Sequence, residues 1–201
     1  YRGYAAQDLC ANCKFEEVAY LILNGELPNK KQLKDFEREE SKERKISKNL
    51  VNAIKNIPKN AHPMDVARTA VSIMGLEDKD TRDNSPKANM RKVMRIFAKM
   101  PVALAAFYRT RKGKKIISPK KKLSFSENFF HMCFGKVPQK EIVKAFDVSL
   151  ILYAEHSFNV STFTARTITS SLSDIHGAIT GAIASLKGPL HGGANEEVMH
   201  M

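Results

Sequence analysis

The chain has 201 residues and a formal net charge of +12, and 43% of its residues are hydrophobic while 27% are charged. These proportions are ordinary for a folded globular protein and exclude an intrinsically disordered chain. No run approaches the roughly 18 to 20 apolar residues that a membrane-spanning helix requires, so no membrane partner is expected. The three cysteines are too few for a disulfide framework, and their odd number favours a reducing compartment.

Apolar residues recur at helical spacing along nearly the whole chain, and no segment alternates polar and apolar residues as a strand does. We therefore predict an all-α fold. Prolines and glycines mark the ends of the expected helices in the first half of the chain. These are a helix over 15–24 ended by Gly25, a charged helix anchored by Leu33 and Phe36, a helix stopped by Pro58, and one that begins at Pro63.

A long helix is expected over 86–109, where Pro101 should introduce a kink. Its apolar stripe is predicted to consist of Val93, Met94, Phe97, Leu104 and Phe107.

A basic loop, at about 109–122, follows this helix. It carries eight lysines and arginines and no acid, and glycine and proline interrupt it, which is typical of a solvated segment between helices. Positive charge suits nucleic acid and small anionic substrates equally well. The loop lacks interleaved aromatic residues and any recognised motif, so we expect no nucleic-acid partner.

Beyond the loop, a strongly apolar helix is predicted over 125–134, and Pro138 opens another that leads toward His156. Ser161 or Thr162 is a suitable N-cap for the helix that comes next.

The last predicted helix runs over 175–186 and is capped by Asp174. Gly177 and Gly181 lie one turn apart on its surface. Small residues at this spacing permit two helix backbones to approach closely, which fits either an internal crossing or a contact between subunits.

Two segments carry residues suited to chemistry. Residues 154–163 contain Glu-His-Ser-Phe-Asn-Val-Ser, in which a histidine and an amide are suited to holding a polycarboxylate. Residues 188–197 begin with Gly-Pro-Leu-His-Gly-Gly, in which glycines permit a ligand to approach the backbone beside a histidine. Together the two segments resemble the citrate synthase family, and the resemblance extends over essentially the whole chain.

The resemblance implies a multi-helical large domain of the citrate synthase type over residues 1–201, incomplete at its end. The small domain, which closes over CoA and contributes the aspartate base and further histidine and arginine residues, would lie beyond Met201. We therefore expect this chain to be inactive by itself. The expectation is wrong if it releases thiol from acetyl-CoA in the presence of oxaloacetate.

The implied reaction is an acyl transfer in the tricarboxylic acid cycle that condenses acetyl-CoA with oxaloacetate to citrate and CoA. The CoA thioester is then a substrate, and no tightly bound cofactor is expected. The resemblance also implies a homodimer in the cytoplasm, with the mitochondrial matrix as the alternative location.

His191 is the implied catalytic residue. It matches the family histidine that donates a hydrogen bond to the thioester oxygen while a base removes the neighbouring proton. A helix is expected to begin near Asn195, and its positive end would keep this imidazole neutral. Gly192 and Gly193 are assigned to CoA binding, because a side chain there would obstruct the pantetheine arm.

The implied substrate-binding residues lie in the first segment. His156 is assigned to a carboxylate or the carbonyl of oxaloacetate, and Asn159 to a supporting hydrogen bond. Ser161 is assigned to the same site as a group that orients His191.

Two alternatives remain open at this point. The first is a 2-methylcitrate synthase that uses propionyl-CoA, although Leu190 favours citrate because the methylcitrate enzymes more often carry lysine there. The second is a non-catalytic helical module that retains only a dimerisation surface.

No metal site is expected. Cys10 and Cys13 have the spacing of a zinc half-site, but only Cys133 remains among the thiols, and no paired histidines lie at a fitting interval. His62 is expected to start a helix, and His131 and His176 to be packing or surface residues.

Overall fold

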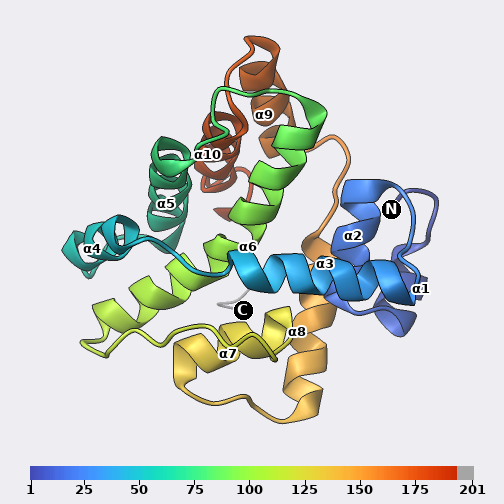
Figure 1. Ribbon diagram of the computed structural model, residues 1–201, viewed down its shortest axis with the longest axis horizontal. Coiled ribbons are helices and arrows are strands. Elements are labelled where there is room, and N and C mark those ends of the chain that lie inside the picture. The colour runs from blue at the N-terminus through green and yellow to red at the C-terminus, as the bar shows by residue number, and fades with distance from the viewer. Residues whose placement is uncertain (194–201) are drawn as a thin grey trace. The chain divides into compact units, whose positions relative to one another are not determined.

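The computed structural model describes residues 1–193, and this part of the chain contains ten helices and no strand (Figure 1). The all-α prediction is therefore confirmed. In chain order the helices are α1 (Ala6–Asn12), α2 (Phe15–Asn24), α3 (Lys30–Glu43), α4 (Lys48–Asn56), α5 (Pro63–Glu77), α6 (Pro86–Arg111), α7 (Phe125–Phe134), α8 (Lys140–Tyr153), α9 (Val160–Ser170) and α10 (Ile175–Leu186).

The helix boundaries follow local chemistry. Gly25 ends α2 in the left-handed conformation, with φ 94°, and its N–H donates to the carbonyl of Leu21. Pro63 and Pro86 occupy first-turn positions of α5 and α6, where a missing N–H is harmless. Helix α1 has no counterpart among the predicted elements, because Leu9 is its only buried residue and gives no periodic signal.

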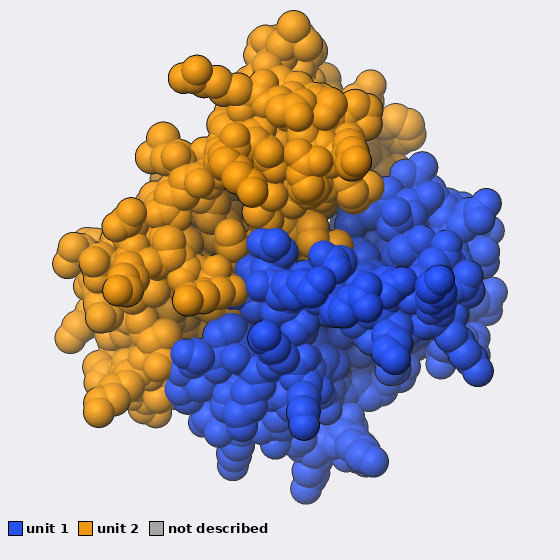
Figure 2. Space-filling model, in the orientation of Figure 1, with its two compact units in different colours: residues 1–44, 117–156 blue, residues 45–116, 157–201 orange. Residues whose placement is uncertain are grey.

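The chain forms two compact units, each built from two separate stretches of sequence (Figure 2). Unit 1 consists of residues 1–44 and 117–156, and unit 2 consists of residues 45–116 together with the chain from Ser157 onward. Within unit 1, α8 packs against α1, α2 and α7. Aromatic pairs join these helices: Phe15 and Phe125 lie 5.0 Å apart between ring centroids, and Phe129 stacks on Phe146 at 5.5 Å.

In unit 2, α10 packs against α5, α6 and α9, while α6 also contacts α4 and α5. The core of this unit consists of Leu50, Ile54, Val66, Ala70, Met74, Ala103, Ala106 and Phe107. These side chains come from α4, α5 and α6, so the long helix is covered on more than one side.

The predicted stripe of α6 is only partly correct. Phe107 is buried, but Val93, Met94, Phe97 and Leu104 are half-buried. The fully buried side chains are Ala88, Lys92, Ile96, Ala98, Val102, Ala103, Ala105, Ala106 and Phe107. A single-stripe pattern fails here because alanines permit close contacts with several neighbouring helices.

Lys92 is the unexpected member of that buried set. It is fully buried, and its Nζ donates to the backbone carbonyl of Asp83 at 2.8 Å. A cation can be buried when backbone oxygens replace its water, so Lys92 fixes the loop that joins α5 to α6.

Two glycines permit close helix crossings within unit 2. A Cβ on Gly181 of α10 would collide with the end of the Ile168 side chain on α9. A Cβ on Gly75 of α5 would lie 2.8 Å from the Cβ of His176 on α10. Gly181 therefore serves an internal crossing, which is one of the two uses that the sequence left open.

None of the helices described here combines the length and the apolar character that crossing a membrane would demand.

Candidate active site

The turn that follows α10 carries the predicted catalytic histidine. The N–H of His191 donates to the carbonyl of Gly188 at 2.9 Å, and the N–H of Gly192 donates to the carbonyl of Leu186 at 2.9 Å. The chain therefore folds back onto the end of its own helix, and two hydrogen bonds hold the segment on either side of the imidazole.

Gly192 is required by this turn itself. A Cβ at this position would collide with the backbone oxygen of Leu186, and backbone cannot move aside as a flexible side chain can. The proposed clearance for a pantetheine arm at Gly192 and Gly193 stays a prediction, and at Gly192 it is not needed to explain the glycine.

The structure brings Ser161 and His191 together. The Ser161 Oγ lies 2.6 Å from the Nε2 of His191, although 30 positions separate the two residues in the sequence. Ser161 stands in the first turn of α9 and His191 in the turn after α10, and these two helices pack against each other. The crossing at Gly181 thus places the serine beside the imidazole.

Asn159 is the N-cap of α9, which corrects the prediction that Ser161 or Thr162 caps this helix. Its Oδ1 accepts a hydrogen bond from the N–H of Thr162 at 2.8 Å. The cap lies earlier than predicted, which leaves the Ser161 hydroxyl available for His191. Because the amide oxygen is engaged, the role of Asn159 toward a substrate stays a prediction that rests on its Nδ2.

His156 follows α8 and is exposed, with its ring edge-on to Tyr153 at 6.2 Å between centroids. It is the last residue of unit 1, whereas His191 belongs to unit 2. The approach of His156 to His191 therefore stays a prediction. Ser157, the next residue, adopts a φ of 50°, a strained conformation for a non-glycine residue.

The hydrogen bond to Ser161 matters because the two nitrogens of a neutral imidazole have different roles. When the serine hydroxyl donates to Nε2, the proton of the ring resides on Nδ1. The Nδ1–H is then a fixed donor for an oxygen atom that develops negative charge. The helix that we expected near Asn195 lies outside the described residues.

The remaining histidines have structural positions. His62 is the N-cap of α5 and its Nδ1 accepts from the N–H of Met64 at 3.1 Å, so it starts a helix as predicted. His131 and His176 are buried, and burial lowers the pKa of both.

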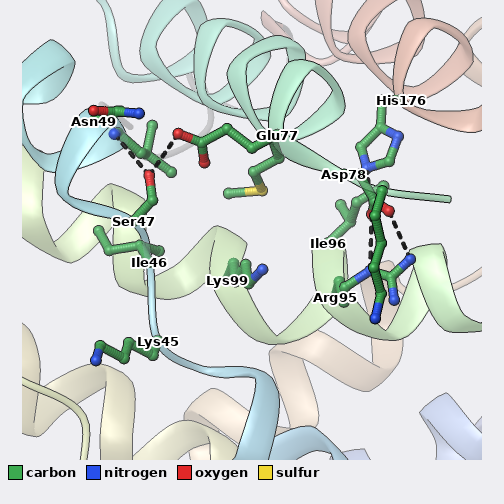
Figure 3. A pocket seen from close by; sticks show the side chains of 13 residues that line it. Lys45, Ile46, Ser47, Asn49, Glu77, Asp78, Arg95, Ile96, Lys99 and His176 are labelled. Atoms are coloured by element: carbon green, nitrogen blue, oxygen red, sulfur yellow. Dashed lines mark hydrogen bonds and ion pairs between the residues drawn. The ribbon is translucent and has the colours of Figure 1, made fainter. Parts of the chain in front are cut away.

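A pocket of about 550 Å³ in unit 2 contains none of the predicted site residues (Figure 3). His176 extends from α10 toward Asp78, whose carboxylate pairs with Arg95 of α6 at 2.7 Å (Figure 3). On another wall, the Ser47 hydroxyl donates to Glu77 at 2.8 Å. Several polar groups of this pocket are thus already paired with one another.

Cys10 and Cys13 are half-buried free thiols, and Cys133 is buried. Across residues 1–193, no three histidine, cysteine, aspartate or glutamate side chains gather into an arrangement that fits a metal ion.

Fold and site together define a helical protein in which a glycine-rich turn holds a histidine against a serine at the start of a neighbouring helix. The family model described as "Citrate synthase, C-terminal domain" matches residues 1–201. The chain therefore belongs to the citrate synthase family.

Relatives in sequence carry two names. The chain is 50% identical over 200 residues to a 2-methylcitrate synthase of Mycobacterium tuberculosis and also 50% identical over 200 residues to a citrate synthase of Mycolicibacterium smegmatis. All of this chain is matched in both comparisons, against 50% and 53% of the two relatives. The chain thus spans about half the length of the curated relatives it matches.

Solved structures agree with this assignment. The citrate synthase of Pyrobaculum aerophilum has a TM-score of 0.92 at 37% identity, with 98% of this chain and 51% of that chain covered. The enzyme of Thermoplasma acidophilum, solved as a ternary complex with carboxymethyl coenzyme A and oxaloacetate, has a TM-score of 0.91 at 33% identity, with 98% and 52% covered.

Proposed function

We propose that this chain provides the thioester-polarising histidine of a citrate synthase-type acyltransferase, which condenses acetyl-CoA with oxaloacetate. The observation that carries the proposal is the 2.6 Å contact between Ser161 and His191 in a turn that only glycine permits. A histidine fixed in this way is suited to donate one hydrogen bond in one direction.

The proposed chemistry begins at the methyl group of the acyl-CoA. A base removes a proton from the carbon next to the thioester, and the electron pair moves toward the thioester oxygen, where the Nδ1–H of His191 stabilises it. The carbon then attacks the ketone carbon of oxaloacetate, whose C=O electron pair moves to the oxygen, and the oxygen takes up a proton to become the hydroxyl of the citryl thioester. Hydrolysis of the resulting citryl thioester releases citrate and the CoA thiol.

The base is not assigned to any described residue of this chain. His156 and the Nδ2 of Asn159 are proposed to hold oxaloacetate, and Gly192 and Gly193 to leave room for the CoA arm. The ternary complex of the Thermoplasma enzyme supports oxaloacetate and a CoA derivative as the relevant ligand classes.

The test measures thiol release by the full-length protein that carries this sequence. His191→Ala should lower kcat by about two to three orders of magnitude, because one donor to a developing oxyanion is typically worth about 3 to 4 kcal/mol. Unchanged turnover in this variant would refute the assignment of His191.

A 2-methylcitrate synthase is the second candidate, and relatives of that name at 50% and 52% identity favour it. Leu190 favours citrate synthase, because the methylcitrate enzymes more often carry lysine at this position. Its side chain is fully exposed in the turn. Competition between acetyl-CoA and propionyl-CoA separates the two candidates. A large preference for propionyl-CoA would overturn the choice of acetyl-CoA.

We also propose that the working protein is a homodimer in the cytoplasm and acts in the tricarboxylic acid cycle. Exposed apolar side chains at and near α9, among them Phe158 and Phe163, support a surface that further polypeptide covers, and we assign that role to a second copy. Cell fractionation checks the location, since recovery of the protein in another compartment would contradict it.

A further inference from the structure

We propose that Asp65 and Lys187 form a positioning pair, which fixes the turn that presents His191. The inference rests on the proposed function, since positioning has a kinetic consequence only if His191 acts in catalysis. The two residues contact no substrate in this proposal. They act through the backbone of the turn.

The pair joins two helix ends in unit 2. The Nζ of Lys187 donates to the Oδ2 of Asp65 at 2.6 Å, across 122 positions of sequence. Asp65 lies in the first turn of α5 and Lys187 is the C-cap of α10. An anion at the start of a helix and a cation at the end of one both complement the helix dipoles, so the position suits each charge.

Lys187 stands where the catalytic turn is attached. Its chain neighbours are Leu186, whose carbonyl accepts from Gly192, and Gly188, whose carbonyl accepts from the N–H groups of His191 and Gly193 at 2.9 and 3.2 Å. The acceptors that shape the turn therefore flank the residue that is bound to α5. A shift of Lys187 would move these acceptors and, with them, the imidazole.

The solvent exposure of Lys187 and Asp65 indicates that the pair positions the turn and contributes little to folding stability. The side chains of Lys187 and Asp65 are 36% and 29% exposed. Ion pairs that water reaches contribute little to global stability. Geometry at a reacting centre is far more sensitive, because a displacement of about 1 Å can lower a rate by about 100-fold. Loss of the pair should therefore affect turnover more than stability.

The chain contains a matched control. Arg68 also pairs with Asp65, at 2.8 Å through Oδ1, but it lies one turn further along α5 and is not attached to the turn. Removing Arg68 takes a cation from the same carboxylate without releasing α10. A difference between the two variants therefore reports the link to the turn and not the charge of Asp65.

The experiment compares Lys187→Gln, Lys187→Arg and Arg68→Gln in the full-length protein. We expect Lys187→Gln to lower kcat about 10-fold, with KM for oxaloacetate changed less than about twofold. Lys187→Arg should restore most of kcat, and Arg68→Gln should leave kcat within about twofold of wild type. Equal losses in Lys187→Gln and Arg68→Gln, or no loss in either, would overturn the inference.

A second measurement keeps this inference distinct from the proposed function. In protein labelled with ¹⁵N-histidine, the ring nitrogens of His191 report its hydrogen bond to Ser161, and His191→Gln assigns the signals. Lys187→Gln should shift these signals and Arg68→Gln should not. If the wild-type protein releases no thiol, the proposed function fails, and the ring signals still decide whether Lys187 positions the histidine. Unmoved signals in Lys187→Gln would exclude it.

Discussion

The hydroxyl of Ser161 lies 2.6 Å from Nε2 of His191, and we propose that this contact selects one of the two forms of a neutral imidazole. Without a partner at Nε2, His191 is free to place its proton on either nitrogen and to rotate. When the serine hydroxyl is the donor, the proton of a neutral ring stays on Nδ1. Under the proposed function, the Ser161 side chain on α9 sets the direction in which His191 donates.

Ser161→Ala should lower kcat by about 10- to 100-fold, because the donor at Nδ1 is no longer fixed. KM for oxaloacetate should change little, whereas His156→Ala should raise it. Steady-state kinetics over a range of both substrates checks this split. Ser161→Thr serves as the control, since it retains a hydroxyl. A kcat for Ser161→Ala equal to that of wild type would show that the 2.6 Å contact has no role in orientation.

His176 makes the stability of unit 2 depend on pH. Burial lowers the pKa of His176 below its ordinary value of 6.5, and neither ring nitrogen has a hydrogen-bond partner among the described residues. Asp78 and Asp174 favour the charged form, while Lys92 and Arg95 oppose it. The native state therefore binds fewer protons than the unfolded state just below pH 6.5.

We therefore predict that the contribution of His176 to the free energy of unfolding is fully present above about pH 6.5. This contribution is lost as the pH falls from about 6.5 through the lowered pKa of His176. Denaturant unfolding at pH 7.5 and 5.5 measures the effect, and His176→Gln should remove it. The pH dependence of the wild type must be compared with that of His176→Gln, because the raised pKa of Glu16 in unit 1 changes the free energy of unfolding with pH in the opposite direction. A pH dependence that is identical in the variant would contradict the prediction.

Among the elements, the crossing of α5 and α10 shows why small residues occur inside helices. Gly75 lies within α5, where alanine would ordinarily be preferred by about 1 kcal/mol. Here the backbone of α10 brings the Cβ of His176 so close that no methyl group fits. Packing between elements therefore overrides the local preference of the helix.

Gly75→Ala should destabilise the protein by about 1 to 3 kcal/mol, since the Cβ of His176 can move only with its backbone. Gly181→Ala is the comparison, because there the obstructing atom is the mobile end of Ile168 and can turn away. Gly181→Ala should therefore destabilise the protein less than Gly75→Ala does. Thermal or denaturant unfolding of both variants checks the order. A Gly75→Ala protein as stable as wild type would contradict the crossing as described.

For the helices, the sequence was most informative where neighbouring residues determine where a helix begins and ends. Capping residues, glycines and apolar spacing predicted the helices at 15–24 and 175–186 with the observed bounds. Pairs that meet only in the folded chain gave no local signal: Lys92 with the carbonyl of Asp83, and Asp65 with Lys187. The site residues themselves came from a motif, because no local property of His191 or Ser161 indicates that they meet.

For the molecule as a whole, apolar surface is the clearest sign of further contacts. Phe158, Val160, Phe163 and Leu172 are between 55% and 95% exposed, and α9 has no buried residue. Monomeric proteins seldom leave several large apolar side chains of one segment in water. Further polypeptide would cover them, either a second copy in the proposed homodimer or the half of the relatives' length that this chain does not span.

Phe163→Asp should therefore weaken self-association of the full-length protein, because it places a charge in a surface that excludes water. Analytical ultracentrifugation over a range of concentrations measures the effect. Leu76→Asp is the matched control, since Leu76 is 86% exposed on α5 and lies outside this segment. If both variants sediment like the wild type, the segment around α9 does not form the dimer contact.

The alternation of the two units along the chain has a consequence for biosynthesis. The polypeptide passes from one unit to the other after residues 44, 116 and 156, so each unit waits for a stretch that the ribosome makes much later. Helices α2 and α3 emerge early, yet α8 is translated only after α4, α5, α6 and α7. Contacts between such distant stretches form slowly and leave apolar faces open in the nascent protein. No single cut in this sequence yields one unit intact as a continuous polypeptide.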